Sequence, residues 1–185
     1  VGVCCQKVSE AEALIDGGVG DVLISNQVVG AKKVARVAAL AQRARLFICV
    51  DDPAQVTALE EAMARAGAGN ATLDVLVEID VGAKRCGVPP GEPAVRLAKL
   101  ISETKHLRFA GLQAYHGSAQ HRRSVEERRA AIASAAELAG QTRDLLHAAG
   151  IDCPKVTGGG TGTFLFEAGS DVYNEENGFR FPGPR

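Results

Sequence analysis

Residues 46–67, LFICVDDPAQVTALEEAMARAG, have the pattern of one complete strand-helix unit. The apolar run at 46–51 is typical of a buried strand. Asp52 follows as a helix N-cap, Pro53 suits the first helical turn, and Gly67 ends the helical pattern. We therefore interpret the two adjacent aspartates as part of a helix cap and not as a metal-binding pair.

The same alternation of strands and helices extends in both directions from this unit. Capping boxes, in which a serine precedes a glutamate by three residues, are expected at Ser9 with Glu12 and at Ser124 with Glu127. Strands are expected at residues 1–5, 21–26, 46–51, 73–81, 107–116, 155–157 and 171–174, and helices at 9–17, from 28, and at 53–66, 93–103 and 124–149.

This alternation predicts a parallel sheet covered by helices, either a (β/α)8 barrel of the TIM type or a doubly wound open sheet. Polar residues gather at the C-terminal ends of the expected strands, which favours the barrel because its active face lies there. They are Gln6, Asn26, Asp51, Asp52, residues 80–85, Tyr115, His116 and Thr157. A complete barrel needs roughly 200 to 250 residues, so this chain of 185 residues is expected to lack at least one strand.

The strand expected at 73–81 has one apolar face and one partly polar face. The apolar face holds Leu73, Val75, Val77, Ile79 and Val81, and the other holds Asp74, Leu76, Glu78 and Asp80. A partly polar face is unusual for a parallel strand with neighbours on both sides.

A loop rich in glycine and threonine follows the strand expected at 155–157. It reads Val156-Thr157-Gly158-Gly159-Gly160-Thr161-Gly162-Thr163. Consecutive glycines let backbone N–H groups converge, and the threonine hydroxyls add donors, so the loop suits an anion such as phosphate. It has neither the Gly-Lys-Ser/Thr of a P-loop nor the spacing of a dinucleotide fingerprint. An ordinary mobile loop is the alternative.

Other candidate site residues each have a structural and a functional interpretation. Arg85 follows a buried strand and lies between glycines, which favours a functional role over a salt bridge to a nearby carboxylate. Tyr115 and His116 end a barrel-type strand, although His116 also fits a satisfied core histidine. Gln6 fits an ordinary loop hydrogen bond, and His121 fits a solvated position before a helix.

The composition is that of an ordinary globular domain. The formal net charge is −1 and the charges are interspersed, which argues against nucleic acid or an anionic membrane as a partner. No apolar run approaches the roughly 20 residues of a membrane span, so we expect a cytoplasmic protein. The five cysteines include no C-x-x-C pair, which indicates reduced thiols and no metal site.

Four segments of the chain are distinctive in combination: VCCQKVSEAEA at 3–13, VLVEIDVG at 75–82 with RCG at 85–87, GLQAYHG at 111–117, and TGGGTGT at 157–163. Together they resemble the D-threonine aldolase and D-3-hydroxyaspartate aldolase family, pyridoxal 5′-phosphate enzymes of the alanine-racemase-like barrel class. The resemblance covers residues 1–175, and it depends on the order and spacing of the segments because no single motif is specific.

The resemblance implies a (β/α)8 barrel of the alanine racemase N-terminal class that carries pyridoxal 5′-phosphate, followed by a β-rich domain. The implied reaction cleaves D-threonine or a related D-3-hydroxy amino acid to glycine and an aldehyde, with a divalent metal of the Mn or Mg type. The implied site residues are Thr157, Gly158, Gly159, Gly160 and Thr161 for the cofactor phosphate, Arg85 for the pyridine nitrogen, Gln6 and Tyr115 for the cofactor ring, and Tyr115, His116 and His121 for catalysis, with His121 managing the proton of the substrate hydroxyl.

By the same resemblance, the first barrel strand, with the lysine that forms the Schiff base, precedes Val1. The metal ligands lie in the later β-rich domain, so none is assigned in this chain, and the chain alone is expected to be an inactive fragment. We expect a partial cofactor-binding barrel at 1–175 and a divergent tail at 176–185. The expected partners are a small D-amino acid and, at full length, a second subunit of a homodimer.

Three alternatives remain at this point. One is a D-serine or D-3-hydroxyaspartate dehydratase on the same barrel. Another is a non-catalytic protein that binds pyridoxal 5′-phosphate. The third is a gene product without function.

Overall fold

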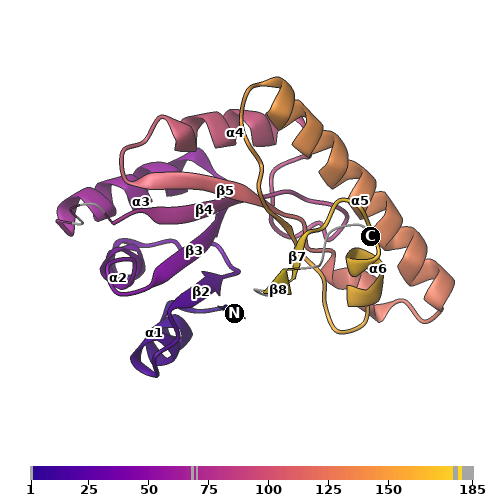
Figure 1. Ribbon diagram of the computed structural model, residues 1–185, viewed down its shortest axis with the longest axis horizontal. Helices are drawn as coiled ribbons and strands as arrows, with labels where there is room; N and C mark the ends of the chain where they lie inside the picture. Colours follow the sequence, from indigo (N-terminus) through magenta and orange to yellow (C-terminus); the bar gives the residue numbers. More distant parts are fainter. Residues whose placement is uncertain (1, 68, 70, 177–178, 181–185) are drawn as a thin grey trace.

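The computed structural model describes residues 2–67, 69, 71–176 and 179–180, and it shows a curved sheet with helices along its outer side (Figure 1). Within these residues the spatial order of the strands follows the chain from β1 to β8. Strands β1 to β7 are parallel, and β8 is antiparallel to β7. The strands are β1 (Val3–Cys5), β2 (Asp21–Ile24), β3 (Arg45–Val50), β4 (Leu73–Glu78), β5 (Leu107–Gln113), β6 (Val156–Thr157), β7 (Glu175–Glu176) and β8 (Phe179–Arg180).

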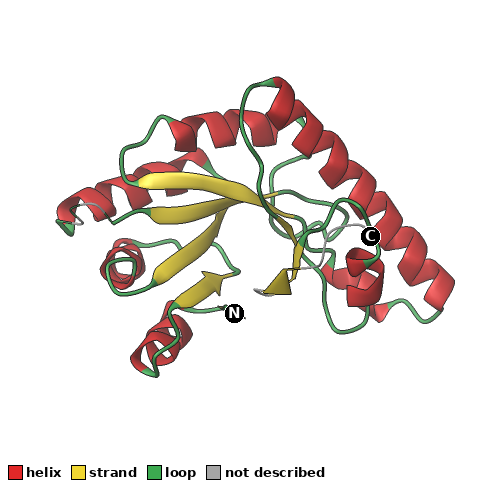
Figure 2. Cartoon of the chain, in the orientation of Figure 1, coloured by secondary structure: helices red, strands yellow, loops and turns green. Residues whose placement is uncertain are grey.

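The helices connect successive parallel strands and lie around the outside of the sheet (Figure 2). They are α1 (Val8–Asp16), α2 (Ala31–Leu40), α3 (Pro53–Arg65), α4 (Glu92–Ser102), α5 (Val125–Ala148) and α6 (Phe164–Ala168), with a 3-10 helix η1 (Gly117–His121). A strand order that never reverses excludes the doubly wound alternative, in which the order reverses at a switch point. The predicted barrel-type sheet is therefore confirmed. No helix in the described residues has the length and the apolar character needed to span a membrane.

Two of the predicted helix starts are confirmed. The Asp52 side chain accepts a hydrogen bond from the Ala54 N–H at 2.7 Å, immediately before α3. At the start of α5, the Ser124 hydroxyl accepts from the Glu127 N–H at 3.0 Å, and the Glu127 carboxylate accepts from the Ser124 N–H at 3.2 Å. These contacts satisfy donors that have no partner within the helix.

The cap predicted for the first helix is wrong by two residues, because the N-cap is Lys7 and not Ser9. Helix α1 begins at Val8, and the carboxylate of Glu10 accepts hydrogen bonds from the N–H groups of Gln6 and Lys7 at 2.8 and 3.1 Å. Glu12 instead pairs with Arg36 on α2. The last predicted strand also differs, because residues 171–174 are irregular and β7 begins just after them. Of the predicted tail at 176–185, residues 177–178 and 181–185 lie outside the described residues.

Both faces of β4 are buried, and the alternation of apolar and polar residues in its sequence corresponds to two faces with different surroundings. The apolar face packs in the main core between the sheet and the helices. On the inner face, Asp74 is only 1% exposed and accepts hydrogen bonds from Arg45 Nε at 3.1 Å and Arg108 Nε at 2.6 Å. Further along this face, Glu78 accepts a hydrogen bond from the Gln27 side chain. Each buried carboxylate therefore has a partner, as burial of charge requires.

A bulge in β5 changes which of its side chains face inward. Val75 pairs with Phe109, but the next residue, Leu76, pairs with Gly111, so Ala110 is the extra residue. Such an insertion shifts the alternation of the side chains that follow it. Gln113 consequently lies opposite Glu78 on the inner face of the sheet.

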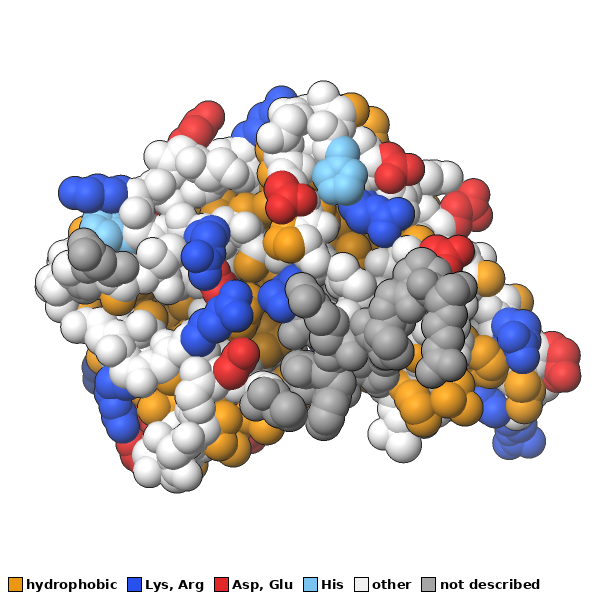
Figure 3. All heavy atoms as spheres, in the orientation of Figure 1, with side chains coloured by type: hydrophobic (Ala, Val, Ile, Leu, Met, Phe, Trp, Pro, Cys, Tyr) orange, Lys and Arg blue, Asp and Glu red, His pale blue; other side chains and the backbone are white. Residues whose placement is uncertain are grey.

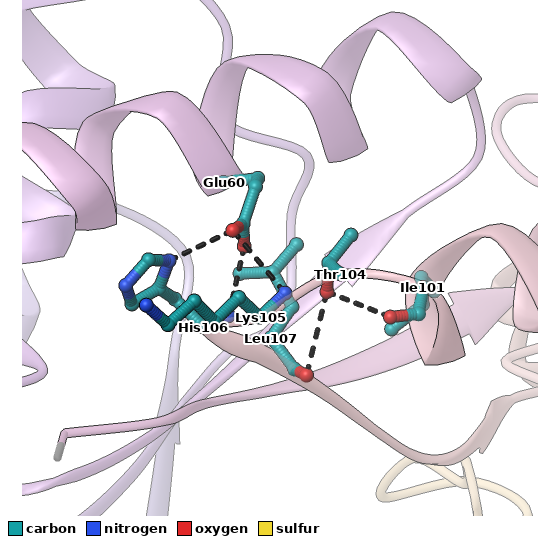
Figure 4. Close-up of polar contacts among 6 residues, drawn as sticks. All are labelled: Glu60, Ile101, Thr104, Lys105, His106 and Leu107. Carbon is teal, nitrogen blue, oxygen red and sulfur yellow. Dashed lines mark hydrogen bonds and ion pairs between the residues drawn. The ribbon is translucent and has the colours of Figure 1, made fainter.

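The turn that leads into β5 is fixed by Glu60 of α3 (Figure 4). Its carboxylate accepts hydrogen bonds from the N–H groups of Lys105 and His106, at 3.2 and 3.0 Å, and lies 2.7 Å from His106 Nδ1. Thr104 closes the same turn by donating to the Ile101 carbonyl at 2.7 Å. Burial raises the pKa of Glu60, but the hydrogen bonds from His106 and Lys105 outweigh it and hold the pKa below its usual value. These contacts anchor β5 at the end opposite to Gln113.

Candidate functional site

A cavity of about 730 Å³ opens at the carboxyl ends of the parallel strands. It is lined by residues of β1, β2, β5, β6 and α1 and of the loops that follow β1, β2, β4, β5 and β6, so segments far apart in sequence meet there. The lining includes Gln6, Arg85, Gln113, Tyr115, Gln120 and the glycine loop, residues 157–161. This is the edge at which α/β barrels place their ligands.

The glycine loop needs its glycines because other groups lie very close to its backbone. A Cβ added at Gly158 would lie 2.7 Å from the Ala114 carbonyl oxygen and 2.8 Å from the Tyr173 ring, and one at Gly160 would overlap the Gln120 carboxamide. Gly159 has φ +89°, in the region that favours glycine. Within the described part of the chain, no group accepts a hydrogen bond from the N–H of residues 159, 160 or 161. The loop therefore offers several free donors to the cavity.

Tyr115 and the end of the glycine loop are tied together by Gln120 of η1. The Gln120 side-chain nitrogen donates to the Tyr115 hydroxyl, and its oxygen accepts from the Gly162 N–H at 3.2 Å. Gly117 leaves room for the tyrosine, since an added Cβ there would lie 2.8 Å from its ring. These two hydrogen bonds of Gln120 hold the phenol of Tyr115 at the cavity wall.

Arg85 reaches the cavity from a loop whose own polar groups are already paired. The Asp80 carboxylate accepts from the N–H groups of Gly82 and Lys84 at 2.9 and 3.0 Å. The Asp51 carboxylate accepts from the Gly87 N–H at 2.9 Å. Within the described part of the chain Arg85 forms no ion pair, and its side chain is exposed. The alternative of a salt bridge to Asp80 or Glu78 is therefore not observed.

The buried carboxyl group of Glu78 lies next to Gln113, which lines the cavity, although Glu78 itself is not a lining residue. Burial raises the pKa of Glu78 above its usual value, and the hydrogen bond from Gln27 and the charge of Arg85 offset part of that effect. Gln113, its neighbour across the β4–β5 pair, lines the cavity and is 7% exposed. Two polar side chains, those of Gln113 and Glu78, are therefore buried at this point of the β4–β5 pair.

Neither predicted catalytic histidine belongs to the cavity lining. His116 is buried against Gly82, whose added Cβ would lie 2.8 Å from His116 Nε2, and its Nδ1 lies 3.3 Å from the Ser118 hydroxyl. Burial and the nearby Arg122 lower the pKa of His116, and Asp80 opposes them. His121 is exposed at the end of η1. Their catalytic assignment stays a prediction.

The structure thus brings together Gln6, Arg85, Tyr115 and the glycine loop, as the resemblance implied. It adds Gln113 and Gln120, which sequence reasoning missed. A polar residue between the apolar residues Leu112 and Ala114 was the available signal for Gln113, whereas nothing in the sequence pointed to Gln120.

Proteins that resemble this chain over nearly its whole length share about half of its residues. A D-threonine aldolase from Arthrobacter sp. is 46% identical over 174 residues, and a 3-hydroxy-D-aspartate aldolase from Paracoccus denitrificans (strain Pd 1222) is 44% identical over 176 residues. These matches cover 94% and 95% of this chain and 45% of each relative, so the chain spans about half the length of these curated relatives.

Comparison with solved structures agrees with the sequence matches. The crystal structure of D-threonine aldolase from Filomicrobium marinum superposes with a TM-score of 0.92 at 52% identity, covering 96% of this chain and 47% of that one. The model of the alanine racemase N-terminal domain matches residues 1–175. This match covers most of the chain, and the consecutive parallel strands with a cavity at their carboxyl ends agree with it. The chain therefore belongs to the alanine racemase N-terminal domain family.

Proposed function

We propose that the protein containing this chain is a pyridoxal 5′-phosphate-dependent aldolase that cleaves D-threonine or a related D-3-hydroxy amino acid to glycine and an aldehyde. The observation that carries the proposal is the 46% identity with a D-threonine aldolase across 94% of the chain. Relatives of a second kind, the 3-hydroxy-D-aspartate aldolases, support the same reaction on a different D-amino acid.

The residues of the cavity fit a phosphorylated pyridine cofactor. The free N–H groups of the glycine loop provide donors for an anion, and side chains at Gly158 or Gly160 would collide with the groups packed there. Arg85, which is always charged and lines the cavity, would supply a cation for the pyridine nitrogen, and a cation there would disfavour protonation of that nitrogen. Gln6 and Tyr115 also line the cavity.

In the proposed reaction the bond between Cα and Cβ of the amino acid breaks. The cofactor, when bound, supplies the electron sink for the electron pair of that bond. The protein must remove the proton of the β-hydroxyl as the aldehyde forms and return a proton to Cα to give glycine. His116 and His121 are the candidates in this chain for moving these protons, and Tyr115 is placed at the cavity wall. A divalent metal remains part of the proposal without an assigned ligand in this chain.

Product analysis of the full-length protein with D-threonine tests the proposed reaction. Glycine and acetaldehyde in equal amounts, dependent on added pyridoxal 5′-phosphate, are expected. Ammonia and 2-oxobutanoate would instead indicate a dehydratase on the same barrel. Cofactor binding with neither pair of products would indicate a non-catalytic binding protein, and either result would contradict the proposal.

A further inference from the structure

Gln120 of η1 joins two parts of the cavity wall that are distant in sequence. Its side-chain nitrogen donates a hydrogen bond to the hydroxyl of Tyr115, which follows β5, and its oxygen accepts from the Gly162 N–H at 3.2 Å, just after the glycine loop. The carboxamide also packs against the loop itself, because a Cβ added at Gly160 would overlap it. The Tyr115 hydroxyl is therefore held close to the glycine loop.

The two contacts of Gln120 determine the direction of the hydrogen bond at Tyr115. A backbone N–H can only donate, so Gly162 requires the carboxamide oxygen on its side, and the NH2 group is left for Tyr115. The NH2 group also only donates, so the Tyr115 oxygen accepts. No group in the described part of the chain accepts the phenolic proton, and Tyr115 is a partly exposed residue of the cavity lining. The proton of Tyr115 is therefore available to a ligand.

The other tyrosine of the sequence has the opposite hydrogen bond. The Tyr173 hydroxyl donates to the Ala114 carbonyl oxygen at 2.8 Å, and the residue is buried. The chain has no further tyrosine and no tryptophan. A spectrum of its tyrosines therefore contains one phenol that accepts and one that donates, and it reports on Tyr115 once the contribution of Tyr173 is known.

We propose that Gln120 is a positioning residue that fixes the direction of the Tyr115 hydroxyl, so that Tyr115 donates its proton to the anion bound by the glycine loop. The inference rests on the proposed function, in which that anion is the phosphate group of pyridoxal 5′-phosphate. Phosphate oxygens accept hydrogen bonds, and a bond to a charged acceptor is stronger than one to a neutral acceptor. Because the hydroxyl is already oriented before the ligand arrives, less conformational freedom is lost on binding.

The first test is the Raman spectrum of the ligand-free chain, in which the intensity ratio of the tyrosine doublet distinguishes a phenol that accepts a hydrogen bond from one that donates. Subtracting the spectrum of Tyr115→Phe from that of the parent isolates Tyr115, whose doublet should be of the accepting type. A doublet of the donating type would overturn the proposal, and this measurement needs no substitution at Gln120.

The same spectrum of Gln120→Glu tests the cause of that direction. Glutamate keeps the length of the side chain and can keep the bond from the Gly162 N–H, but a carboxylate only accepts. Tyr115 should therefore change to the donating type, as seen after subtracting the spectrum of the variant that also carries Tyr115→Phe. A doublet that stays of the accepting type would mean that Gln120 does not set the direction.

The second test is a double-mutant cycle on the affinity for inorganic phosphate. Tyr115→Phe removes the phenolic donor and should weaken phosphate binding about tenfold. In the Gln120→Glu background the phenolic proton is already bonded to the carboxylate, so the same substitution should weaken binding less than about twofold. Repulsion between the new carboxylate and phosphate cancels, because both variants in that comparison contain it. Equal effects of Tyr115→Phe in the two backgrounds would overturn the role of Gln120.

Gln141→Glu on α5 is the matched control, since it makes the same change of charge at an exposed position outside the cavity lining. Tyr115→Phe should weaken phosphate binding as much in that background as in the parent. Unchanged phosphate affinity of Tyr115→Phe in the parent would overturn the proposal and leave the proposed function standing. Failure of the unsubstituted protein to bind phosphate and pyridoxal 5′-phosphate would contradict the proposed function, and the Raman spectra would still decide the direction of the hydrogen bond at Tyr115.

Discussion

Arg85 brings a positive charge to the cavity from a loop that does not depend on it. The backbone of this loop is held by Asp80 and by the bond from Gly87 to Asp51, and neither contact involves the arginine. Loss of the Arg85 side chain should therefore weaken ligand binding more than it lowers stability. Measuring both quantities distinguishes a binding role from a structural one.

Arg85→Ala is expected to weaken pyridoxal 5′-phosphate binding by about ten- to a hundredfold, because a charge-assisted hydrogen bond is lost. The unfolding temperature should stay within about 2 °C of the parent value. Binding titration and thermal unfolding check the two parts. Arg96→Ala, at an exposed position on α4, is the control and should change neither. Unchanged cofactor affinity in Arg85→Ala would remove Arg85 from the site.

The glycines of the loop provide a second residue-scale prediction. Gly158→Ala should lower the free energy of unfolding by about 1–3 kcal/mol, since its Cβ would lie 2.7 Å from the Ala114 carbonyl oxygen. It should also weaken phosphate binding. Gly162→Ala in the same loop is the matched control, because its Cβ would make an ordinary contact of 3.4 Å with Gln120. Equal effects of the two substitutions on denaturant unfolding would contradict this account.

Among the elements, β5 determines whether Gln113 points to the inner face of the sheet, where it lines the cavity. Its bulge at Ala110 is possible because Gly111 adopts φ +138° and has the Lys155 backbone directly against it. Without the extra residue, the alternation along the strand would turn Gln113 away from the inner face. The orientation of Gln113 thus depends on one glycine two positions earlier.

Gly111→Ala should lower the free energy of unfolding by about 2–4 kcal/mol, because a strained φ and an overlap with Lys155 add together. Urea denaturation measures this loss. Gly20→Ala is the control, since nothing lies within 4 Å of the added Cβ and the change should be near neutral. A similar unfolding midpoint for Gly111→Ala and the parent would show that β5 does not require the bulge.

The turn before β5 gives a prediction about pH. The folded-state pKa of Glu60 is lowered, so its contribution to stability is fully present above the unfolded value of about 4.3 and is lost as pH falls through the lower folded value. Glu60→Gln should therefore be less stable than the parent by about 1–2 kcal/mol at neutral pH, and the difference should shrink at lower pH. Equilibrium unfolding at several pH values measures it. A pH-independent difference would contradict the role of the carboxylate.

Predictions from sequence succeeded where the signal was local. The caps at Asp52 and Ser124 depend on a few adjacent residues, and the strand-helix alternation predicted the parallel sheet. The cap of α1 was misplaced because two pairs of residues with the same spacing, Ser9 with Glu12 and Lys7 with Glu10, overlap within residues 7–12. The inward turn of Gln113 depends on pairing between β4 and β5, which no local pattern encodes.

At the scale of the molecule, convergence of the strand ends assembles the cavity. Arg85 and the glycine loop lie on different connections, and both line one space of about 730 Å³. On the face that Figure 3 shows, acidic and basic side chains are interspersed, in keeping with the net charge of −1. The donors for an anion are therefore local to the cavity and not a property of the whole surface.

Equilibrium dialysis of the 185-residue chain against pyridoxal 5′-phosphate tests the central claim most directly. The account predicts saturable binding of about one cofactor per chain that inorganic phosphate displaces and that Gly158→Ala weakens while Gly162→Ala does not. Binding that neither phosphate nor the Gly158 substitution affects, or no saturable binding at all, would contradict the assignment of the glycine loop as the phosphate site.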